Sequence, residues 1–67
     1  MNKFAERLKQ ELKAKQITQV ELAKKIGTSQ SVINKYCAGK REPSLDTIML
    51  ICKALGETSD YLLGLED

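Results

Sequence analysis

Apolar residues recur every three or four positions through most of the chain, which is the spacing of one face of an α-helix. Phe4, Leu8 and Leu12 form such a stripe near the N-terminus, and most of the positions between them are charged or polar. Asn2 stands where the N-cap of a helix is expected. The pattern therefore predicts a first amphipathic helix over residues 3–15.

The second helix has the most specific start signal in the sequence. Thr18 and Glu21 have the spacing of a capping box, in which each side chain accepts a hydrogen bond from the free backbone N–H of the other residue. Gly27 suits the left-handed residue that commonly ends a helix. The apolar positions beside and along this helix are Ile17, Leu22, Ala23 and Ile26.

A third helix follows almost at once. Thr28 or Ser29 can cap its start, and Gly39 marks its end. Its apolar positions are Ile33, Tyr36 and Cys37. The second and third helices, joined by a tight turn at Gly27, have the arrangement of a helix-turn-helix, which places its second helix in the major groove of DNA.

Residues 40–43 are predicted as a loop, and two more helices follow. Ser44 caps the fourth helix, Gly56 ends it, and Thr58 caps a short fifth helix. Their apolar positions are Leu45, Ile48, Ile51, Cys52 and Leu55 in the fourth, and Tyr61, Leu62 and Leu63 in the fifth. No segment alternates apolar and polar residues over the length of a strand, so the predicted fold class is all-α with five helices.

Length and composition limit the function. A chain of 67 residues is expected to form one domain, residues 1–67, with a thin core. Without His, the two cysteines, Cys37 and Cys52, cannot make a usual zinc site, and we interpret both as reduced core residues. With no Gly-rich phosphate loop either, we expect no enzyme, no metal and no cofactor. The longest uncharged apolar stretch, residues 48–52, is too short for a membrane span, which indicates a cytoplasmic protein.

Charge is divided unevenly along the chain. Eleven Lys and Arg residues against nine Asp and Glu residues leave a net charge of only +2. Residues 1–41 nevertheless carry ten basic and three acidic side chains, whereas residues 42–67 carry one basic and six acidic ones. The first part has the charge to face an anion such as DNA, although a solvated helix surface would give the same count.

Polar residues of the third helix are the candidates for reading DNA. At about 100° per residue, one arc of about 140° holds four polar side chains, and the apolar positions occupy a separate arc. Gln and Asn can make bidentate contacts with adenine, Lys can donate to guanine, and Ser can donate or accept. The predicted base-reading residues are Gln30, Ser31, Asn34 and Lys35.

A second set of residues is suited to phosphate contacts. These residues lie at the starts of the second and third helices, where backbone amides are free, or in the basic loop after the third helix. The predicted phosphate-contacting residues are Gln19, Thr28, Ser29, Lys40 and Arg41. Lys24 and Lys25 add positive charge nearby, and they would serve solubility equally well.

With these motifs in place, the chain resembles the phage-repressor and Cro family of helix-turn-helix regulators, also called the XRE family, over about residues 3–63. The resemblance rests on Thr18-Gln19-x-Glu21-Leu22-Ala23, Ile26-Gly27-x-Ser29-Gln30-Ser31, Ile33-Asn34-Lys35-Tyr36, Gly39-Lys40, Pro43-Ser44-Leu45 and Ala54-Leu55-Gly56. It implies a compact five-helix, lambda-repressor-like domain.

The resemblance also implies roles for particular residues. Gln19 would hold a phosphate and buttress Gln30, which would read a base, and Ser31 and Lys35 would occupy further base-reading positions. An Arg and a Glu that pair in many relatives correspond here to Leu12 and Cys37, so an apolar contact would replace a salt bridge. Two further departures are Ala38, at a position that commonly contacts phosphate, and Glu57, at a position that is usually apolar.

We interpret the protein as a sequence-specific transcriptional regulator, and we expect a repressor that binds a palindromic operator in double-stranded DNA as a homodimer. Candidate residues of the dimer surface are Met49, Leu50, Tyr61 and Leu65. The alternative hypothesis is an antitoxin or another protein-interaction module that uses the same bundle to hold a protein partner. A stoichiometric protein partner, without DNA retention at moderate salt, would favour the alternative.

Overall fold

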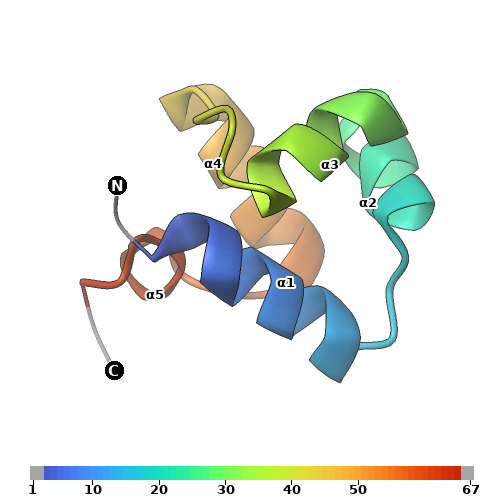
Figure 1. The fold of residues 1–67 in the computed structure, drawn as a ribbon. Coiled ribbons are helices and arrows are strands. Elements are labelled where there is room, and N and C mark those ends of the chain that lie inside the picture. Colours follow the sequence, from blue (N-terminus) through green and yellow to red (C-terminus); the bar gives the residue numbers. More distant parts are fainter. Residues whose placement is uncertain (1–2, 66–67) are drawn as a thin grey trace.

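The computed structural model describes residues 3–65 and contains five helices, without a strand in that range. Figure 1 shows the helices in chain order. They are α1 (Phe4–Ala14), α2 (Gln19–Ile26), α3 (Gln30–Cys37), α4 (Leu45–Leu55) and α5 (Ser59–Leu63). The all-α fold class with five helices is therefore confirmed.

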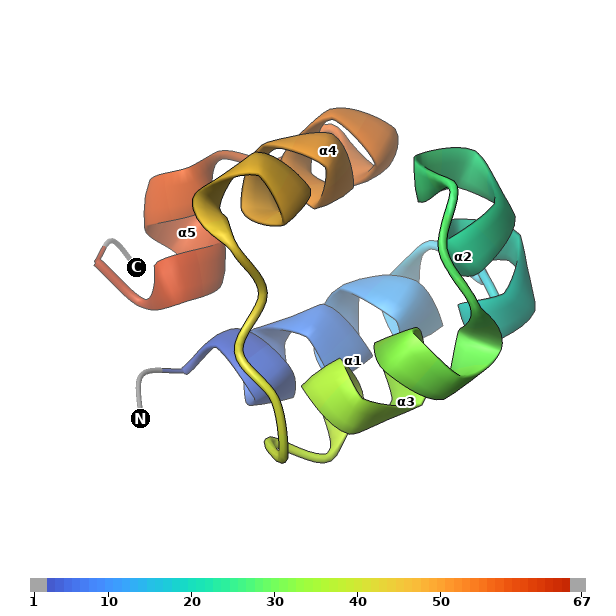
Figure 2. The same ribbon diagram turned by 90° about the horizontal axis from the view of Figure 1, so that it is seen from above.

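The helices surround one core. α1 packs against α3 and α5, whereas α4 packs against α2 and α5, and α2 packs directly against α3. Figure 2, seen from above, shows α3 and α4 on opposite sides of the interior, with α2 and α5 at the two ends. The described part of the molecule measures 27 × 23 × 20 Å. Segments far apart in the sequence thus enclose a single apolar centre.

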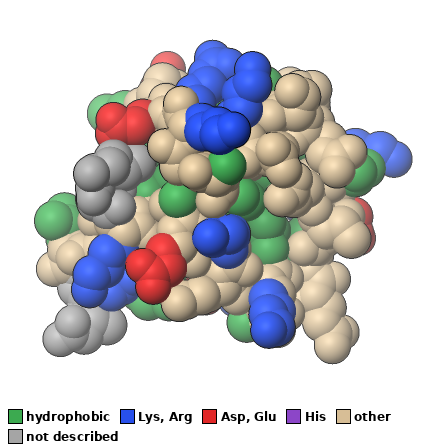
Figure 3. All heavy atoms as spheres, viewed as in Figure 1, with side chains coloured by type: hydrophobic (Ala, Val, Ile, Leu, Met, Phe, Trp, Pro, Cys, Tyr) green, Lys and Arg blue, Asp and Glu red, His purple; other side chains and the backbone are tan. Residues whose placement is uncertain are grey.

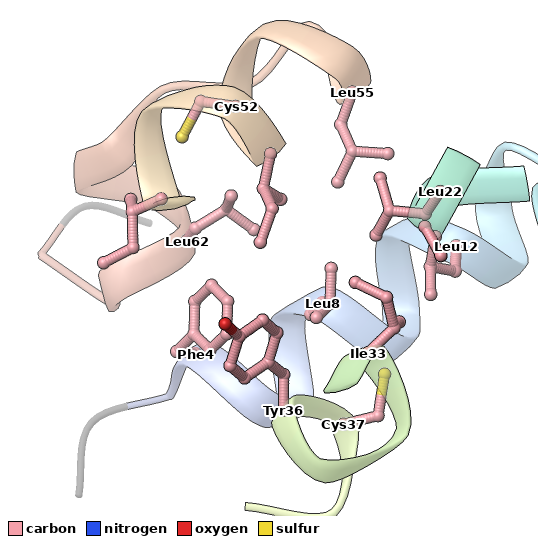
Figure 4. Packing of buried hydrophobic residues seen from close by; sticks show 13 residues of the cluster. Phe4, Leu8, Leu12, Leu22, Ile33, Tyr36, Cys37, Cys52, Leu55 and Leu62 are labelled. Atoms are coloured by element: carbon pink, nitrogen blue, oxygen red, sulfur yellow. The ribbon is translucent and has the colours of Figure 1, made fainter. Parts of the chain in front are cut away.

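Every helix contributes to the buried cluster, and Figure 4 shows side chains from all five helices meeting in the centre. The Phe4 and Tyr36 rings meet edge to face, with ring centroids 6.3 Å apart and planes at 77°. The buried apolar residues are Phe4, Leu8, Leu12, Leu22, Ala23, Ile33, Tyr36, Cys37, Ile48, Ile51, Cys52, Leu55 and Leu62. Most of the predicted apolar stripes are therefore confirmed.

The predicted capping chemistry is confirmed at α2. The Thr18 side chain accepts from the Glu21 N–H at 3.1 Å, and the Glu21 carboxylate accepts from the Thr18 N–H at 2.9 Å. The hydrogen bond from the Thr18 backbone lowers the pKa of Glu21, because it stabilises the ionised carboxylate. Gly27 ends the helix at φ +76°, a left-handed conformation that favours glycine. The start and end of this helix are therefore encoded locally.

The remaining caps also follow the predicted residues. Ser29, and not Thr28, caps α3, while Ser44 and Thr58 cap α4 and α5. Gly39 and Gly56 have positive φ beyond the ends of α3 and α4. A cap of this kind typically contributes about 0.5–2 kcal/mol, which is a substantial share for so small a domain.

Two predictions differ from the structure. The N-cap of α1 is Lys3, which makes no side-chain capping hydrogen bond, and the predicted cap, Asn2, lies outside the described residues. Leu45 was expected in the buried stripe of α4, but it is 68% exposed. It is the first residue of its helix, and because a Cα–Cβ bond tilts toward the helix N-terminus, its side chain projects past the end of α4.

The structure is consistent with an apolar contact between Leu12 and Cys37, at the positions where many relatives have a salt bridge. Leu12 of α1 and Cys37 of α3 both lie in the buried cluster, and α1 packs against α3. Cys37 and Cys52 are free thiols, as expected. Burial raises the pKa of both thiols, because a thiolate loses hydration inside the protein. Neither cysteine therefore has the exposed, acidic character of a reactive thiol.

One buried charged group was not expected. Glu11 of α1 is only 9% exposed, and its Oε1 atom accepts no hydrogen bond. Lys15 Nζ lies 3.5 Å from Glu11 Oε1 and 3.8 Å from Glu57 Oε2, which makes it an ion-pair partner of both carboxylates. The Glu57 side chain, at the position that is usually apolar, thus pairs with the residue that caps the end of α1. The helical spacing of α1 by itself gave no signal of this cluster.

Burial raises the pKa of Glu11, and the neighbouring Glu57 carboxyl raises it further, against the opposing effect of Lys15. A carboxyl with a raised pKa in the folded state stabilises the fold fully below its unfolded pKa, and that contribution is lost as pH rises through the folded pKa. We therefore expect Glu11→Gln to increase the free energy of unfolding at pH 7 relative to the parent protein. The gain should shrink as pH falls toward about 4.5, the ordinary pKa of the carboxyl.

Urea unfolding at several pH values between 4 and 7 measures this difference in the free energy of unfolding. In small proteins that free energy usually falls by about 1–3 kcal/mol per M of urea. Glu6→Gln is the control, because it removes the same charge from an exposed position on the same helix. A Glu11→Gln variant that is less stable than the parent at pH 7, or whose gain grows on acidification, would contradict the assignment.

Candidate nucleic-acid interface

The turn between α2 and α3 is short and closed by backbone hydrogen bonds. The N–H groups of Gly27 and Thr28 both donate to the carbonyl oxygen of Ala23. Ser29 then starts α3, because its side chain accepts from the Val32 N–H at 3.3 Å. Leu22 and Ile33, one on each side of the turn, are both fully buried. The two helices are therefore held in one arrangement by the turn and by the core beneath it.

The outer face of α3 is exposed in the described part of the chain. Ile33, Tyr36 and Cys37 face the core, as predicted. The four predicted base-reading residues are all exposed, and none of their side chains makes a hydrogen bond or an ion pair within residues 3–65. They are Gln30, Ser31, Asn34 and Lys35. Their donors and acceptors are therefore available to a ligand that approaches this face.

The predicted phosphate-contacting residues lie at the start of α2, in the turn between α2 and α3, and in the loop after α3. Gln19 is the first residue of α2 and is half-buried, as is Thr28 in the turn. Ser29 is exposed, although its oxygen already serves as the cap of α3. Lys40 and Arg41 are exposed in the loop after α3, where the Lys40 N–H donates to the Lys35 carbonyl at 2.9 Å.

Figure 3 shows Lys and Arg side chains gathered at the upper edge of this face, over the segment that joins α3 to α4. The neighbouring surface over α3 is formed mainly by backbone and by side chains that are neither charged nor hydrophobic. A surface with positive charge beside neutral hydrogen-bonding groups suits a nucleic acid, because cations contact phosphates while neutral polar groups read base edges. Lys24 and Lys25, also exposed, follow in the last turn of α2.

Two contacts that the resemblance to the family raises are not seen within the described residues. The structure has no hydrogen bond between the Gln19 and Gln30 side chains, so the buttress stays a prediction for a complex with DNA. Ala38 ends α3 as an exposed residue whose methyl side chain cannot hydrogen-bond a phosphate. Lys40 and Arg41, which follow Ala38 closely in the sequence, are exposed cations.

The candidate dimer residues do not form one uniform surface. Met49 and Leu50 are exposed on α4, and Leu65 is exposed after α5. Tyr61 is only half exposed, because the Arg7 guanidinium lies 4.5 Å from the centre of its ring and also donates to the Tyr61 carbonyl at 2.8 Å. Tyr61 thus already serves to hold α5 against α1. Leu45, which the helical pattern predicts to be buried, is a further exposed apolar residue.

Comparison with known proteins shows that the chain is similar to helix-turn-helix proteins. A family model described as helix-turn-helix matches residues 8–62. The chain is 36% identical over 64 residues to YobD of Bacillus subtilis (strain 168), named as an uncharacterised HTH-type transcriptional regulator, with 96% of this chain and 57% of YobD covered. It is 34% identical over 64 residues to the HTH-type transcriptional activator BcrR of Enterococcus faecalis, with 96% of this chain and 31% of BcrR covered. The chain thus spans little more than half of YobD and about a third of BcrR.

A solved structure shows the same arrangement of helices. The P22 c2 repressor, in complex with a synthetic operator, superimposes with a TM-score of 0.88 at 30% identity, with 94% of this chain and 96% of that chain covered. Within residues 3–65, none of the helices is long and apolar enough to cross a membrane. The chain belongs to the helix-turn-helix family of transcriptional regulators of the phage-repressor and Cro type, which is not a family of enzymes.

Proposed function

We propose that this protein regulates transcription by binding a specific site in double-stranded DNA, with α3 in the major groove. The observation that carries the proposal is the unobstructed polar face of α3, held on a buried apolar face next to a tight turn. A recognition helix needs both faces, because rigid support from the core positions the side chains that read bases. The operator-bound P22 c2 repressor supports the same role.

In this proposal, two sets of residues have different tasks. Gln30 and Asn34 offer paired donors and acceptors that match adenine, and Lys35 offers a donor to guanine. Ser31 can adapt to either kind of base. The phosphate set, Gln19, Thr28, Ser29, Lys40 and Arg41, supplies affinity that depends on salt but carries little sequence information.

We further propose that the protein acts as a homodimer and represses transcription from a palindromic operator. Two half-sites about one helical turn apart double the contacts available to so small a domain. Met49 and Leu50 are exposed apolar residues that a second copy could cover. A reporter gene behind the selected site separates the roles: repression requires that reporter output falls when the protein is present. This role on DNA also accounts for the cytoplasmic localisation that the sequence predicts.

Selection of bound sites from a random pool of duplex DNA, at a stated salt concentration, tests the proposed function. We expect one enriched half-site, present as an inverted repeat. Sedimentation with the winning duplex should show two protein copies per repeat. No enrichment over the starting pool, together with recovery of a stoichiometric protein partner, would instead support a protein-interaction module.

The loop cations should govern the salt dependence of binding. Lys40→Ala and Arg41→Ala are each expected to lower the slope of log K against log salt by about one, because each loses one phosphate contact. Affinity should fall by a similar factor for selected and unselected DNA. Lys13→Ala is the control, since it removes the same charge from an exposed position on α1. Equal slopes for the three variants and the parent protein would mean that Lys40 and Arg41 do not contact phosphates.

A further inference from the structure

The first half of α1 lies against the end of α3. Gly39 forms the turn after α3 at φ +72°, and a Cβ atom placed on it would lie 3.9 Å from the Cβ atom of Ala5 on α1. The N–H of Lys40 closes this turn on the carbonyl oxygen of Lys35 at 2.9 Å. Ala38, the exposed residue before the turn, has a methyl side chain that cannot hydrogen-bond a phosphate. The α1 surface around Ala5 therefore borders the position where a contact common in relatives is missing.

Lys9 extends this α1 surface along α3. It follows Ala5 by four residues and so lies on the same side of the helix. Burial raises the pKa of the Cys37 thiol, and the Lys9 ammonium group opposes that rise, which indicates that the ammonium group lies near the last turn of α3. Lys9 is exposed, and within residues 3–65 its side chain makes no hydrogen bond or ion pair. A solvated cation from α1 is therefore available beside the end of α3.

Positive charge reaches the end of α3 from two separate segments of the chain. Lys9 belongs to α1, whereas Lys40 and Arg41 are exposed in the loop that follows α3. Figure 3 shows Lys and Arg side chains over α1 as well as over the segment that joins α3 to α4, on the same face of the molecule. When a helix lies in the major groove, the two sugar-phosphate strands border the groove, so each end of the helix lies close to a strand. Cations at the end of α3 are thus suited to phosphate contacts.

A purely structural role for Lys9 is the alternative. The C-terminal end of a helix carries a partial negative charge, and a cation beside it stabilises the helix. α3 already has Lys35 in its last turn, so this need is met within the helix itself. The two roles also differ in their consequences. A phosphate contact changes the salt dependence of DNA binding, whereas a structural contact changes the free energy of unfolding and leaves the salt dependence as it is.

We propose that Lys9 is a further phosphate-contacting residue, which binds the DNA backbone at the end of α3 where Ala38 offers no contact. The inference deepens the proposed function and rests on its central part, the position of α3 in the major groove. It does not depend on the homodimer, on repression or on the identity of the site.

The salt dependence of binding tests this role for Lys9. Affinity for the selected duplex is measured at several salt concentrations for the parent protein and for single variants. We expect Lys9→Ala to lower the slope of log K against log salt by about one for each bound copy. Affinity should fall about eightfold per copy at about 0.1 M salt, the factor that one released counterion contributes relative to 1 M. Lys9→Arg should keep the parent slope, because Arg carries the same charge.

Lys13→Ala is the matched control on the same helix. Lys13 is also exposed, but it lies in the last turn of α1. Figure 1 shows that α1 and α3 diverge from the end of α3, so that the last turn of α1 lies away from α3. The control should therefore keep the parent slope. Equal slopes for Lys9→Ala, Lys13→Ala and the parent would overturn the proposal.

A cation introduced at position 38 tests where the contact lies. In the Lys9→Ala protein, Ala38→Lys should restore the slope, because it supplies a cation next to the same phosphate. In the parent protein it should raise the slope by less, since one phosphate is neutralised only once. Additive effects of the two substitutions would mean that positions 9 and 38 serve different phosphates, and would contradict the proposal.

Stability measurements and the parent protein separate the remaining outcomes. Urea unfolding of Lys9→Ala detects a structural role: a variant with lower stability and the parent slope would show that Lys9 only stabilises the end of α3. A parent protein that binds the selected duplex no more tightly than random duplex would end the proposed function and this inference with it. Tight binding by the parent, with an unchanged slope for Lys9→Ala, would refute the role of Lys9 alone.

Discussion

Leu55→Ala is expected to destabilise the fold by about 2–5 kcal/mol, the usual cost of removing a buried leucine side chain and leaving a cavity. Leu55 is the last residue of α4 and is only 4% exposed. Its side chain points from α4 into the buried cluster, on the side where Figure 4 shows Leu22 of α2, and α4 packs against α2. A domain of this size typically has roughly 3–10 kcal/mol of total stability, so the variant should lose a large fraction of it. Urea or thermal unfolding followed by circular dichroism measures the loss.

Leu45→Ala is the matched control. It makes the same chemical change at the opposite end of the same helix, where the leucine is exposed. We expect an effect within about 0.5 kcal/mol, because a solvated side chain loses little burial and alanine has a good helix propensity. Equal losses for the two variants would mean that Leu45 belongs to the core after all.

Gln30→Ala is expected to reduce affinity for the best DNA site by about 1–3 kcal/mol, the discrimination that one bidentate contact supplies. Preference should relax at one base pair of the half-site and stay intact elsewhere. Gln30 is the first residue of α3 and is exposed, so its truncation should leave the fold unchanged. Competition binding with single-base variants of the selected site measures both effects at one salt concentration.

Gln10→Ala provides the comparison for this experiment. Gln10 is also an exposed glutamine on a helix, but it lies on α1 and outside both predicted contact sets. It should leave affinity and base preference unchanged. If Gln30→Ala weakens all sequences equally, Gln30 contacts a phosphate and not a base. If it changes neither affinity nor base preference, Gln30 does not contact the DNA, while the fold and the family assignment stand.

Local chemistry explains why so much of the fold could be predicted. The capping box of Thr18 and Glu21 and the left-handed Gly27 depend only on residues within one or two turns. The buried faces of α1 and α3 follow from helical spacing, because a helix in a small domain has one side to bury. The polar face of α3 follows in turn, since burial of Ile33, Tyr36 and Cys37 directs the opposite side chains outward.

Neighbours from distant parts of the chain decided the rest. Phe4 and Leu45 are both the first residue of a helix and both continue an apolar stripe, yet Phe4 is fully buried and Leu45 is not. The Tyr36 ring packs against Phe4, whereas the Leu45 side chain projects past its helix into solvent. Glu11 shows the reverse case: its burial beside Lys15 and Glu57 follows from how the segment before α5 meets α1.

The sequence by itself determined the helices, their caps, the apolar faces and the candidate recognition helix, because each depends on contacts within about one turn of the chain. Only the tertiary structure decided which stripe residues at helix ends are covered, which charged group is buried, and which apolar side of α4 stays open. Those outcomes depend on where helices from separate segments meet, and hydrophobic spacing along one helix carries no information about its neighbours.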